Sequence, residues 1–311
     1  MVNVKDIVKH YGAVQALKGV SFEVTKGEIF GVIGPDGAGK TTLIRILATL
    51  LLADSGSATV TGVDVVMGYR EVRRNIGYMP GRFSLYQDLS VVENLQLFAT
   101  VYHTSIEENY HLIKDIYQQI EPFAHRKAGK LSGGMKQKLA LSCALIHKPK
   151  VLFLDEPTTG VDPVSRKEFW EMLKNLKKQG ISILVSTPYM DEATLCDRIA
   201  LIQEGRFLQI DTPQNMVNQF PKPLYAIESL NNYQLLQQLK RDPCVESVYI
   251  CGDLLHCTFM GDRNPFDMER VTLDGDRFAH KEIPPTIEDC FIRLMSQHSH
   301  STTLKKQPQR V

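Results

Sequence analysis

The stretch GPDGAGKTT, residues 34–42, constrains the fold of this chain more than any other segment. It matches the pattern G-x-x-x-x-G-K-[ST], which requires a buried strand before it and a helix after it. Both are predicted here, because residues 28–33 are strand-like and apolar, and residues 40–51 place leucines on one helical face. A glycine-rich turn would explain the glycines alone, but not a lysine and a hydroxyl in register with both elements. We therefore expect a phosphate-binding loop.

The residue types of this loop suit the phosphates of a nucleoside triphosphate. Gly37 and Gly39 let the backbone curl so that N–H groups point inward at phosphate oxygens, and the helix N-terminus adds a partial positive charge. Lys40 would reach the β- and γ-phosphates, and Thr41 would offer its hydroxyl to Mg²⁺. We expect ATP and Mg²⁺ as ligands, bound by Gly34, Gly37, Ala38, Gly39, Lys40, Thr41 and Thr42.

A second motif, VLFLDE at residues 151–156, fits the same site. A buried apolar strand would deliver Asp155 to its C-terminal end, where ligands bind in such sheets. Asp155 would hold the Mg²⁺, and Glu156 would be the catalytic general base that polarises an attacking water. The alternative is a strand that merely ends in solvated acids, and the phosphate loop argues against it.

Strands and helices alternate along the first two thirds of the chain. Short strands are predicted at residues 20–24, 181–186 and 199–203, a mostly helical segment at residues 90–119, and a helix that begins at Asp162-Pro163 and stops near Gly180. Residues 54–57, Asp-Ser-Gly-Ser, are predicted to be a turn. Buried strands that alternate with helices predict a parallel α/β core.

Length and composition exclude several classes of protein. The chain has 311 residues, which suits about two domains, and its net charge of +1 gives no electrostatic reason to bind nucleic acid. The N-terminus lacks the apolar core of a signal peptide, and no run approaches the ~18 apolar residues needed to span a bilayer. We therefore expect a cytosolic protein that forms no membrane pathway by itself.

The cysteines do not have the spacing of a metal site. Cys251, His256 and Cys257 cluster on strand-like sequence, but no pair follows the pattern C-x-x-C. Reduced thiols are therefore favoured over a zinc site.

The stretch LSGGMKQK, residues 131–138, resembles the signature of ATP-binding cassette (ABC) ATPases, which usually has glutamine at the place of Met135. With GPDGAGKTT and LDEPTTGVDP in the same order, the resemblance covers about residues 1–218. Ser132, Gly133 and Gly134 would open a helix and form a second anion-binding N-terminus. In the family this end faces the nucleotide of the opposite subunit, so that two cassettes sandwich two ATP molecules. The resemblance implies an α/β fold with a P-loop ATPase core, a parallel sheet and a helical subdomain, about residues 82–150, that carries the signature.

Other positions match the family one by one. Tyr11 resembles the aromatic residue that stacks on adenine. Asp162 resembles the aspartate of the loop through which the two nucleotide sites communicate, and it would also cap the helix before Pro163. Residues 83–97 resemble the part of the helical subdomain that docks on the membrane partner, although their aromatic side chains would equally suit core packing.

The last third of the chain differs in composition. Residues 219–302 predict a small C-terminal α+β module, and residues 303–311 are polar and basic and are predicted to be disordered. The stretch IPPTIEDCFIRLM, residues 283–295, resembles the end of cassette subunits that serve exporters with small, separately encoded permeases.

Two positions depart from the family pattern. Gly81 stands where a glutamine normally touches Mg²⁺ and the attacking water, and Pro188 stands where a histidine normally braces the γ-phosphate. Proline has neither an imidazole nor an N–H donor. Because the loop, Asp155, Glu156 and Ser132 are kept, we expect intact nucleotide binding and slow hydrolysis.

The resemblance implies an ATP-hydrolysing subunit of an ABC membrane transporter, peripheral on the inner face of the cell membrane. It would drive a separate integral membrane permease and pair with a second cassette, as a homodimer or a heterodimer. An ATP-gated cassette with little hydrolysis of its own is the alternative. A soluble ABC ATPase acting on ribosomes or DNA is less favoured, because such proteins usually carry a second cassette, a long coiled-coil insertion or C-x-x-C pairs in one chain.

Overall fold

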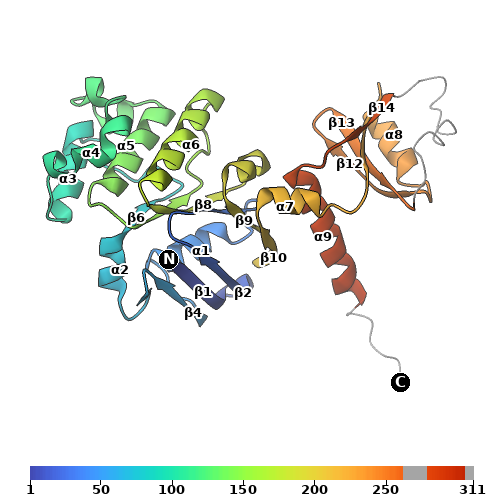
Figure 1. Cartoon of the computed structure of the whole chain (residues 1–311), viewed down its shortest axis with the longest axis horizontal. Coiled ribbons are helices and arrows are strands. Elements are labelled where there is room, and N and C mark those ends of the chain that lie inside the picture. Colours follow the sequence, from blue (N-terminus) through green and yellow to red (C-terminus); the bar gives the residue numbers. More distant parts are fainter. Residues whose placement is uncertain (262–278, 305–311) are drawn as a thin grey trace. The chain divides into compact units, whose positions relative to one another are not determined.

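The computed structural model describes residues 1–261 and 279–304, with side chains through residue 297. These residues divide into two compact units, Met1–Pro213 and Gln214–Val311 (Figure 1). The strands of the first unit are β1 (Val2–Tyr11), β2 (Val14–Val24), β3 (Ile29–Ile33), β4 (Ser55–Val60), β5 (Val63–Asp64), β6 (Ile76–Met79), β7 (Val151–Asp155), β8 (Ser182–Thr187), β9 (Arg198–Gln203) and β10 (Arg206–Asp211). Its α-helices are α1 (Lys40–Leu47), α2 (Tyr69–Asn75), α3 (Val91–Val101), α4 (Ile106–Tyr117), α5 (Gly133–Leu145) and α6 (Pro163–Lys178).

The central sheet of the first unit confirms the predicted α/β fold. Its six strands follow the order β10-β9-β3-β8-β7-β6, and every neighbouring pair is parallel except β10 with β9. Every residue of β3 and β7 is buried, as expected for strands covered on both faces. The carboxyl ends of β3, β7 and β8 therefore meet at one edge of the sheet, next to the start of α1.

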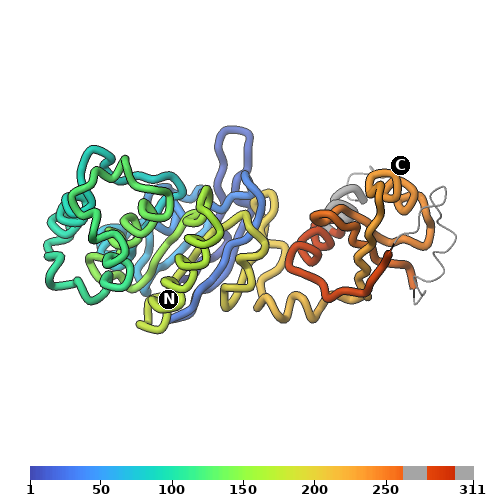
Figure 2. The backbone as a smooth tube through the Cα atoms, turned by 90° about the horizontal axis from the view of Figure 1, so that it is seen from above, coloured from blue at the N-terminus to red at the C-terminus, as the bar shows by residue number. Residues whose placement is uncertain are grey.

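A second, antiparallel sheet was not predicted. It has the order β2-β1-β4-β5, and its β1–β2 hairpin extends beyond the rest of the first unit (Figure 2). Two local predictions were wrong here. The first helix stops at Leu47, before Thr49 adopts a φ of 61°, and residues 55–57 form the start of β4 instead of a turn, because they pair with β1.

The predicted helical segment at residues 90–119 is two helices, α3 and α4, that lie with α5 at one end of the first unit (Figure 1). Ser90 and Glu93 form a reciprocal capping box at the start of α3. The helix ends near Tyr102, and His103 follows with a φ of 56°. Ser105 then caps α4 by accepting a hydrogen bond from the Glu108 backbone N–H.

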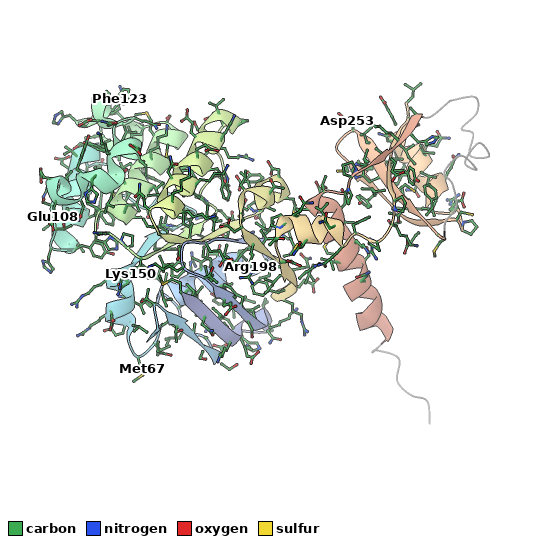
Figure 3. The ribbon with its side chains drawn as sticks, in the orientation of Figure 1. Met67, Glu108, Phe123, Lys150, Arg198 and Asp253 are labelled. Atoms are coloured by element: carbon green, nitrogen blue, oxygen red, sulfur yellow. The ribbon has the colours of Figure 1, made fainter. Side chains whose placement is uncertain are left out.

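Buried side chains hold the central sheet and its helices together. Trp170 on α6 and Phe153 on β7 are among the largest fully buried side chains. At the amino end of β9, Arg198 (labelled in Figure 3) lies 3.3 Å from the Glu28 carboxylate. Burying one large apolar side chain contributes about 1.5–3 kcal/mol to stability, so these contacts fix the strands that carry the site.

The second unit is an α+β module, as predicted. It contains α7 (Pro213–Asn218), β11 (Leu224–Glu228), α8 (Asn232–Leu239), β12 (Val245–Cys251), β13 (Leu254–Phe259), β14 (Ala279–Ile283) and α9 (Ile287–Leu304). Its described strands form an antiparallel sheet of order β12-β13-β11-β14, and α8 packs on that sheet through Leu235 and Leu239. Of the tail predicted to be disordered, residues 303–304 belong to α9, and residues 305–311 lie outside the described residues.

Candidate active site

The loop between β3 and α1 has a backbone that only glycine accommodates easily. Gly37 and Gly39 adopt φ values of 78° and 108°, in the left-handed region that L side chains rarely enter. A Cβ atom on Gly34 would lie 2.2 Å from the Ile202 carbonyl oxygen, and one on Gly39 would lie 2.6 Å from the Ala16 carbonyl oxygen. The pattern of glycines therefore reflects both backbone conformation and close packing against neighbouring segments.

Lys40 is the first residue of α1, and its side chain is almost fully buried. Its ammonium donates hydrogen bonds to the Gly34 and Pro35 carbonyl oxygens, at 2.8 and 3.0 Å. It also lies 3.0 Å from Oε1 of Glu156. The loop thus bends around the lysine, and the ammonium joins the loop to the acidic end of β7.

Oxygen atoms suited to a magnesium ion converge beside this lysine. The Thr41 hydroxyl donates to Oδ1 of Asp155 at 3.0 Å, and the Ser186 hydroxyl donates to the same oxygen at 2.8 Å. Burial raises the pKa of Asp155, while these two hydrogen bonds act in the opposite direction. A hydroxyl and a carboxylate within contact of each other are the hard oxygen donors that Mg²⁺ prefers, so the residues present fit this ion.

Glu156 directly follows β7 and adopts a φ of 50°, which is uncommon for a residue other than glycine. Its backbone N–H donates to both the carbonyl oxygen and the hydroxyl of Ser186, each at 3.1 Å. Such conformations persist where the surroundings hold them, and they concentrate at functional sites. The turn directs the Glu156 carboxylate toward Lys40 at the open edge of the sheet.

Gly81 and Pro188 also lie at this edge. A Cβ atom on Gly81 would lie 2.9 Å from the Asp155 carbonyl oxygen, closer than side chains normally approach. Pro188 follows β8 directly, and the carbonyl oxygen of the preceding Thr187 accepts a hydrogen bond from the Gly34 N–H at 3.3 Å. Gly81 therefore lies beside Asp155 and Glu156, and Pro188 follows the strand end that contacts the loop at Gly34.

The residue after Pro188 is engaged elsewhere. The Arg166 guanidinium of α6 lies 4.1 Å from the centre of the Tyr189 ring. The Nε atom of Arg166 also lies 3.7 Å from the Glu192 carboxylate. Glu192 in turn accepts a hydrogen bond from the Thr187 hydroxyl at 2.5 Å. These contacts of Arg166 and Glu192 with residues 187–189 were not predicted, because Arg166 is distant from those residues in the sequence.

The signature residues begin α5, as predicted. Ser132 caps the helix by accepting a hydrogen bond from the Met135 N–H, and Asp162 caps α6 by accepting from the Val164 and Ser165 N–H groups. A Cβ atom on Gly134 would lie 2.8 Å from the Ser165 hydroxyl oxygen, so the two helix starts pack closely. A cavity of about 140 Å³ beside them is lined by residues that include Gly81, Gly133 and Glu156.

Tyr11 is the last residue of β1, and it precedes the phosphate loop in the sequence by more than 20 residues. It pairs with Val14 across the hairpin turn and is 48% exposed. An exposed ring at a hairpin tip is available for stacking.

Comparisons with known proteins agree with this geometry. Residues 17–159 match the family model described as ABC transporter. The chain is 36% identical over 297 residues to the Nod factor export ATP-binding protein I of Burkholderia thailandensis, covering 94% of this chain and 96% of that protein. This chain belongs to the ABC transporter ATP-binding proteins. The chain is also 41% identical over 274 residues, 86% of its length, to the probable multidrug ABC transporter ATP-binding protein YbhF of Escherichia coli, and it spans about half, 47%, of the length of that relative.

Solved structures match the cassette as well. The ATP-binding subunit of an ABC transporter is 30% identical with a TM-score of 0.65, covering 71% of this chain and 93% of that one. The dimeric ATP-binding cassette MJ0796, in a post-hydrolysis state bound to ADP and Pi, is 27% identical with a TM-score of 0.62, covering 68% of this chain and 98% of that one.

Among the described residues, the C-terminal module contains a group with the composition of a metal site. Ligand atoms of Cys251, His256 and Asp289 lie within 4.8 Å of one another. Both oxygens of Asp289 are already engaged, however: Oδ1 accepts from the Tyr249 hydroxyl at 2.7 Å and pairs with His256 at 2.6 Å, and Oδ2 accepts from the N–H and hydroxyl of Thr286.

These hydrogen bonds account for the group without a metal. Burial raises the pKa of Asp289, but the hydrogen bonds from Tyr249, His256 and Thr286 together hold this pKa below its ordinary value. Asp289 therefore ties the start of α9 to β12 and β13. Cys257, which the sequence placed in the same cluster, belongs to the apolar core of the module instead.

Proposed function

We propose that this cassette is the ATP-binding and ATP-hydrolysing subunit of an export-type ABC transporter. One observation carries the proposal: Lys40, Thr41, Asp155 and Glu156 converge at the edge of the sheet where the glycine loop opens. The names of the relatives support the export direction, because they describe a probable multidrug transporter protein and Nod factor export proteins. They name transporters, so they give no support to action on ribosomes or DNA.

The ion pair between Lys40 and Glu156 suggests how binding prepares hydrolysis. Phosphate oxygens of ATP would compete with Glu156 for the Lys40 ammonium, which lies 3.0 Å from that carboxylate. Binding would thereby release Glu156 to accept a proton from water. Thr41 and Asp155 would hold Mg²⁺, which when bound neutralises charge on the phosphates. Electrostatic positioning of this kind supplies most of the catalysis in phosphoryl transfer.

Lys40→Ala tests this assignment. We expect the affinity for ATP to fall about 10- to 100-fold, because charge-assisted hydrogen bonds contribute about 1.5–3 kcal/mol each. The measurement is a titration with ATP that carries a fluorescent label on the ribose. Lys174→Ala is the matched control, since Lys174 pairs with Glu171 on the surface at 3.0 Å. Equal affinities for both variants and the unmodified protein would contradict the proposed pocket.

The signature residues point to a second cassette as a partner. Ser132 and Gly133 at the start of α5 are exposed, and a helix N-terminus attracts anions. In one chain this end is additional to the phosphate loop, and we propose that it completes a nucleotide site on the partner. The defects at Gly81 and Pro188 favour a partner that keeps both the glutamine and the histidine, because one good site would then remain.

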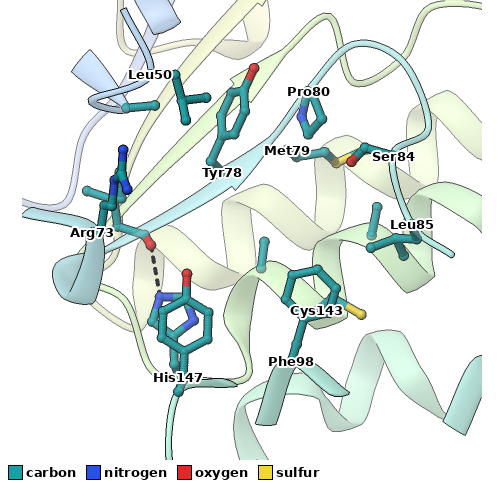
Figure 4. A pocket seen from close by; sticks show the side chains of 15 residues that line it. Leu50, Arg73, Tyr78, Met79, Pro80, Ser84, Leu85, Phe98, Cys143 and His147 are labelled. Carbon is teal, nitrogen blue, oxygen red and sulfur yellow. Dashed lines mark hydrogen bonds between the residues drawn. The ribbon is translucent and has the colours of Figure 1, made fainter. Parts of the chain in front are cut away.

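We further propose that a cytoplasmic segment of the permease docks in an apolar groove between β6 and the helices of residues 91–145. The cavity has a volume of about 430 Å³, and its lining includes Tyr78, Leu85, Phe98, Ala140 and His147 (Figure 4). It adjoins residues 83–97, the segment that the sequence associates with the membrane partner, and the strand β6 that leads into Gly81. No helix in the described part of the chain is long and apolar enough to span a bilayer, so a docked permease would place the cassette on the inner face of the membrane.

Ala140→Arg tests the groove. A long charged side chain there would fill the space, and we expect the amount of cassette that copurifies with its permease to fall at least about tenfold, which corresponds to 1.4 kcal/mol. Ala140 also lines the cavity of about 140 Å³ beside Gly81 and Glu156, so binding of labelled ATP is measured in the same samples and should be unchanged. Ala124→Arg is the control, because Ala124 is also partly exposed in the same helical region but does not line the groove. Normal copurification of the Ala140 variant would contradict docking at this place.

A further inference from the structure

One side chain contacts both acidic residues of the site, and no sequence pattern indicates its role. Ser186 lies on β8, directly opposite Asp155 of β7 in the parallel register. Residues paired across neighbouring strands point to the same face of a sheet. The apolar run ILV that precedes Ser186 indicates a buried strand. This pattern does not indicate a role for the serine hydroxyl.

The Ser186 hydroxyl is the donor of one hydrogen bond and the acceptor of another. It donates to Oδ1 of Asp155 at 2.8 Å, and it accepts from the backbone N–H of Glu156 at 3.1 Å. Ser186 is fully buried, so no water replaces these bonds at the hydroxyl. Hydrogen bonds to a carboxylate are roughly twice as strong as neutral ones.

The first of these bonds orients the carboxylate that fits a metal. Asp155 accepts side-chain hydrogen bonds from Thr41 and Ser186. If the Thr41 hydroxyl turned to a magnesium ion, Ser186 would be the one of these two residues that still donates a hydrogen bond to the Asp155 carboxylate. The ligating carboxylate would then keep its orientation through this serine, in the way that outer hydrogen-bond partners orient metal ligands.

The second bond holds the turn at Glu156. This residue has a φ of 50°, and its N–H is shared between the carbonyl and the hydroxyl oxygen of Ser186. The hydroxyl therefore supports the conformation that directs the Glu156 carboxylate toward Lys40.

We propose that Ser186 is a positioning residue that orients the metal-binding carboxylate of Asp155 and the general base Glu156 together. The inference rests on the proposed function, since it concerns the same site. Ser186 acts through Asp155 and Glu156 and is not proposed to touch the substrate.

Ser182 provides a matched control on the same strand. It is also fully buried, and its hydroxyl oxygen accepts one hydrogen bond, from the Gly27 N–H at 2.9 Å. Removing either hydroxyl creates the same loss of volume in β8, but only Ser186 contacts the acidic residues. A general weakening of the strand would affect both variants alike.

The experiment measures Mn²⁺ affinity, as a probe of the magnesium site, in protein saturated with a non-hydrolysable ATP analogue. Electron paramagnetic resonance follows the loss of the free Mn²⁺ signal, and nucleotide binding is measured in the same samples. We expect Ser186→Ala to weaken Mn²⁺ binding at least about tenfold, the usual effect of removing an outer partner of a metal ligand. Ser182→Ala should leave it unchanged, and Ser186→Thr, which keeps the hydroxyl, should restore it.

Two results would overturn the inference: an unchanged Mn²⁺ affinity in Ser186→Ala, or an equal loss in Ser182→Ala. If Ser186→Ala does not fold, Ser186→Cys preserves the volume and donates only weakly, and retained Mn²⁺ affinity in that variant would equally overturn it. An unmodified protein that binds no nucleotide would instead overturn the proposed function, and the inference with it.

Discussion

Glu156→Gln is expected to lower ATP turnover about 10²- to 10⁴-fold, the usual contribution of a general base. Glutamine has the same shape and tolerates the same backbone conformation, so the turn at a φ of 50° should persist. ATP affinity should not fall, because the variant removes the carboxylate that competes for the Lys40 ammonium. Phosphate release in a single turnover, together with binding of labelled ATP, measures both quantities.

The control for this variant is Glu168→Gln on the exposed side of α6, where the carboxylate pairs with Lys138. It should change neither turnover nor binding. If Glu156→Gln hydrolyses ATP as fast as the unmodified protein, then Glu156 is not the base, and its ion pair with Lys40 has only a structural role.

The sequence predicted local structure well where one short segment contains all the information. The loop at residues 34–42 and the cap at Asp162 depend on neighbouring residues, and the structure has both features. The strand β1 was missed because its pattern is interrupted: Asp6 adopts a φ of 49°, and the register with β2 shifts between Val4 and Ile7. An alternation that is broken by a bulge does not give the regular period of two.

Contacts between distant segments could not be predicted from the sequence. The hydrogen bonds of Ser186 with Asp155 and Glu156 depend on which strands are neighbours in the sheet. The pairing of His256 with Asp289 likewise depends on how α9 packs on β13. For these residues, the pattern of a single sequence predicts the strand or helix that contains them but not which other strand or helix packs beside it.

The structure shows that a larger side chain at position 81, where the family usually has glutamine, would meet a steric obstacle. The Asp155 carbonyl oxygen would lie 2.9 Å from a Cβ atom at this position, so a glutamine there requires the backbone to shift. Gly81 therefore differs from a glutamine in steric fit as well as in functional group. Gly81→Ala is consequently a necessary control for Gly81→Gln, since it introduces the steric change without the amide.

The second large effect is expected from restoring both family residues. Loss of one electrostatic stabiliser of a transition state costs about 10²–10³ in rate, and groups that act as a unit are not additive. We expect Gly81→Gln with Pro188→His to raise kcat about 10²-fold, with little change in KM, because Lys40, Thr41 and Asp155 already support the bound substrate. Each single variant should recover less, and Gly81→Ala should recover nothing.

We propose that this cassette binds ATP normally but hydrolyses it slowly, and the most direct test is the steady-state ATPase activity of the isolated chain. We expect saturable ATP binding, a turnover well below the ~1–10 s⁻¹ of a typical enzyme, and a large gain in the double Gly81→Gln, Pro188→His variant. Turnover of the unmodified chain at ~1–10 s⁻¹, with no gain in the double variant, would contradict it.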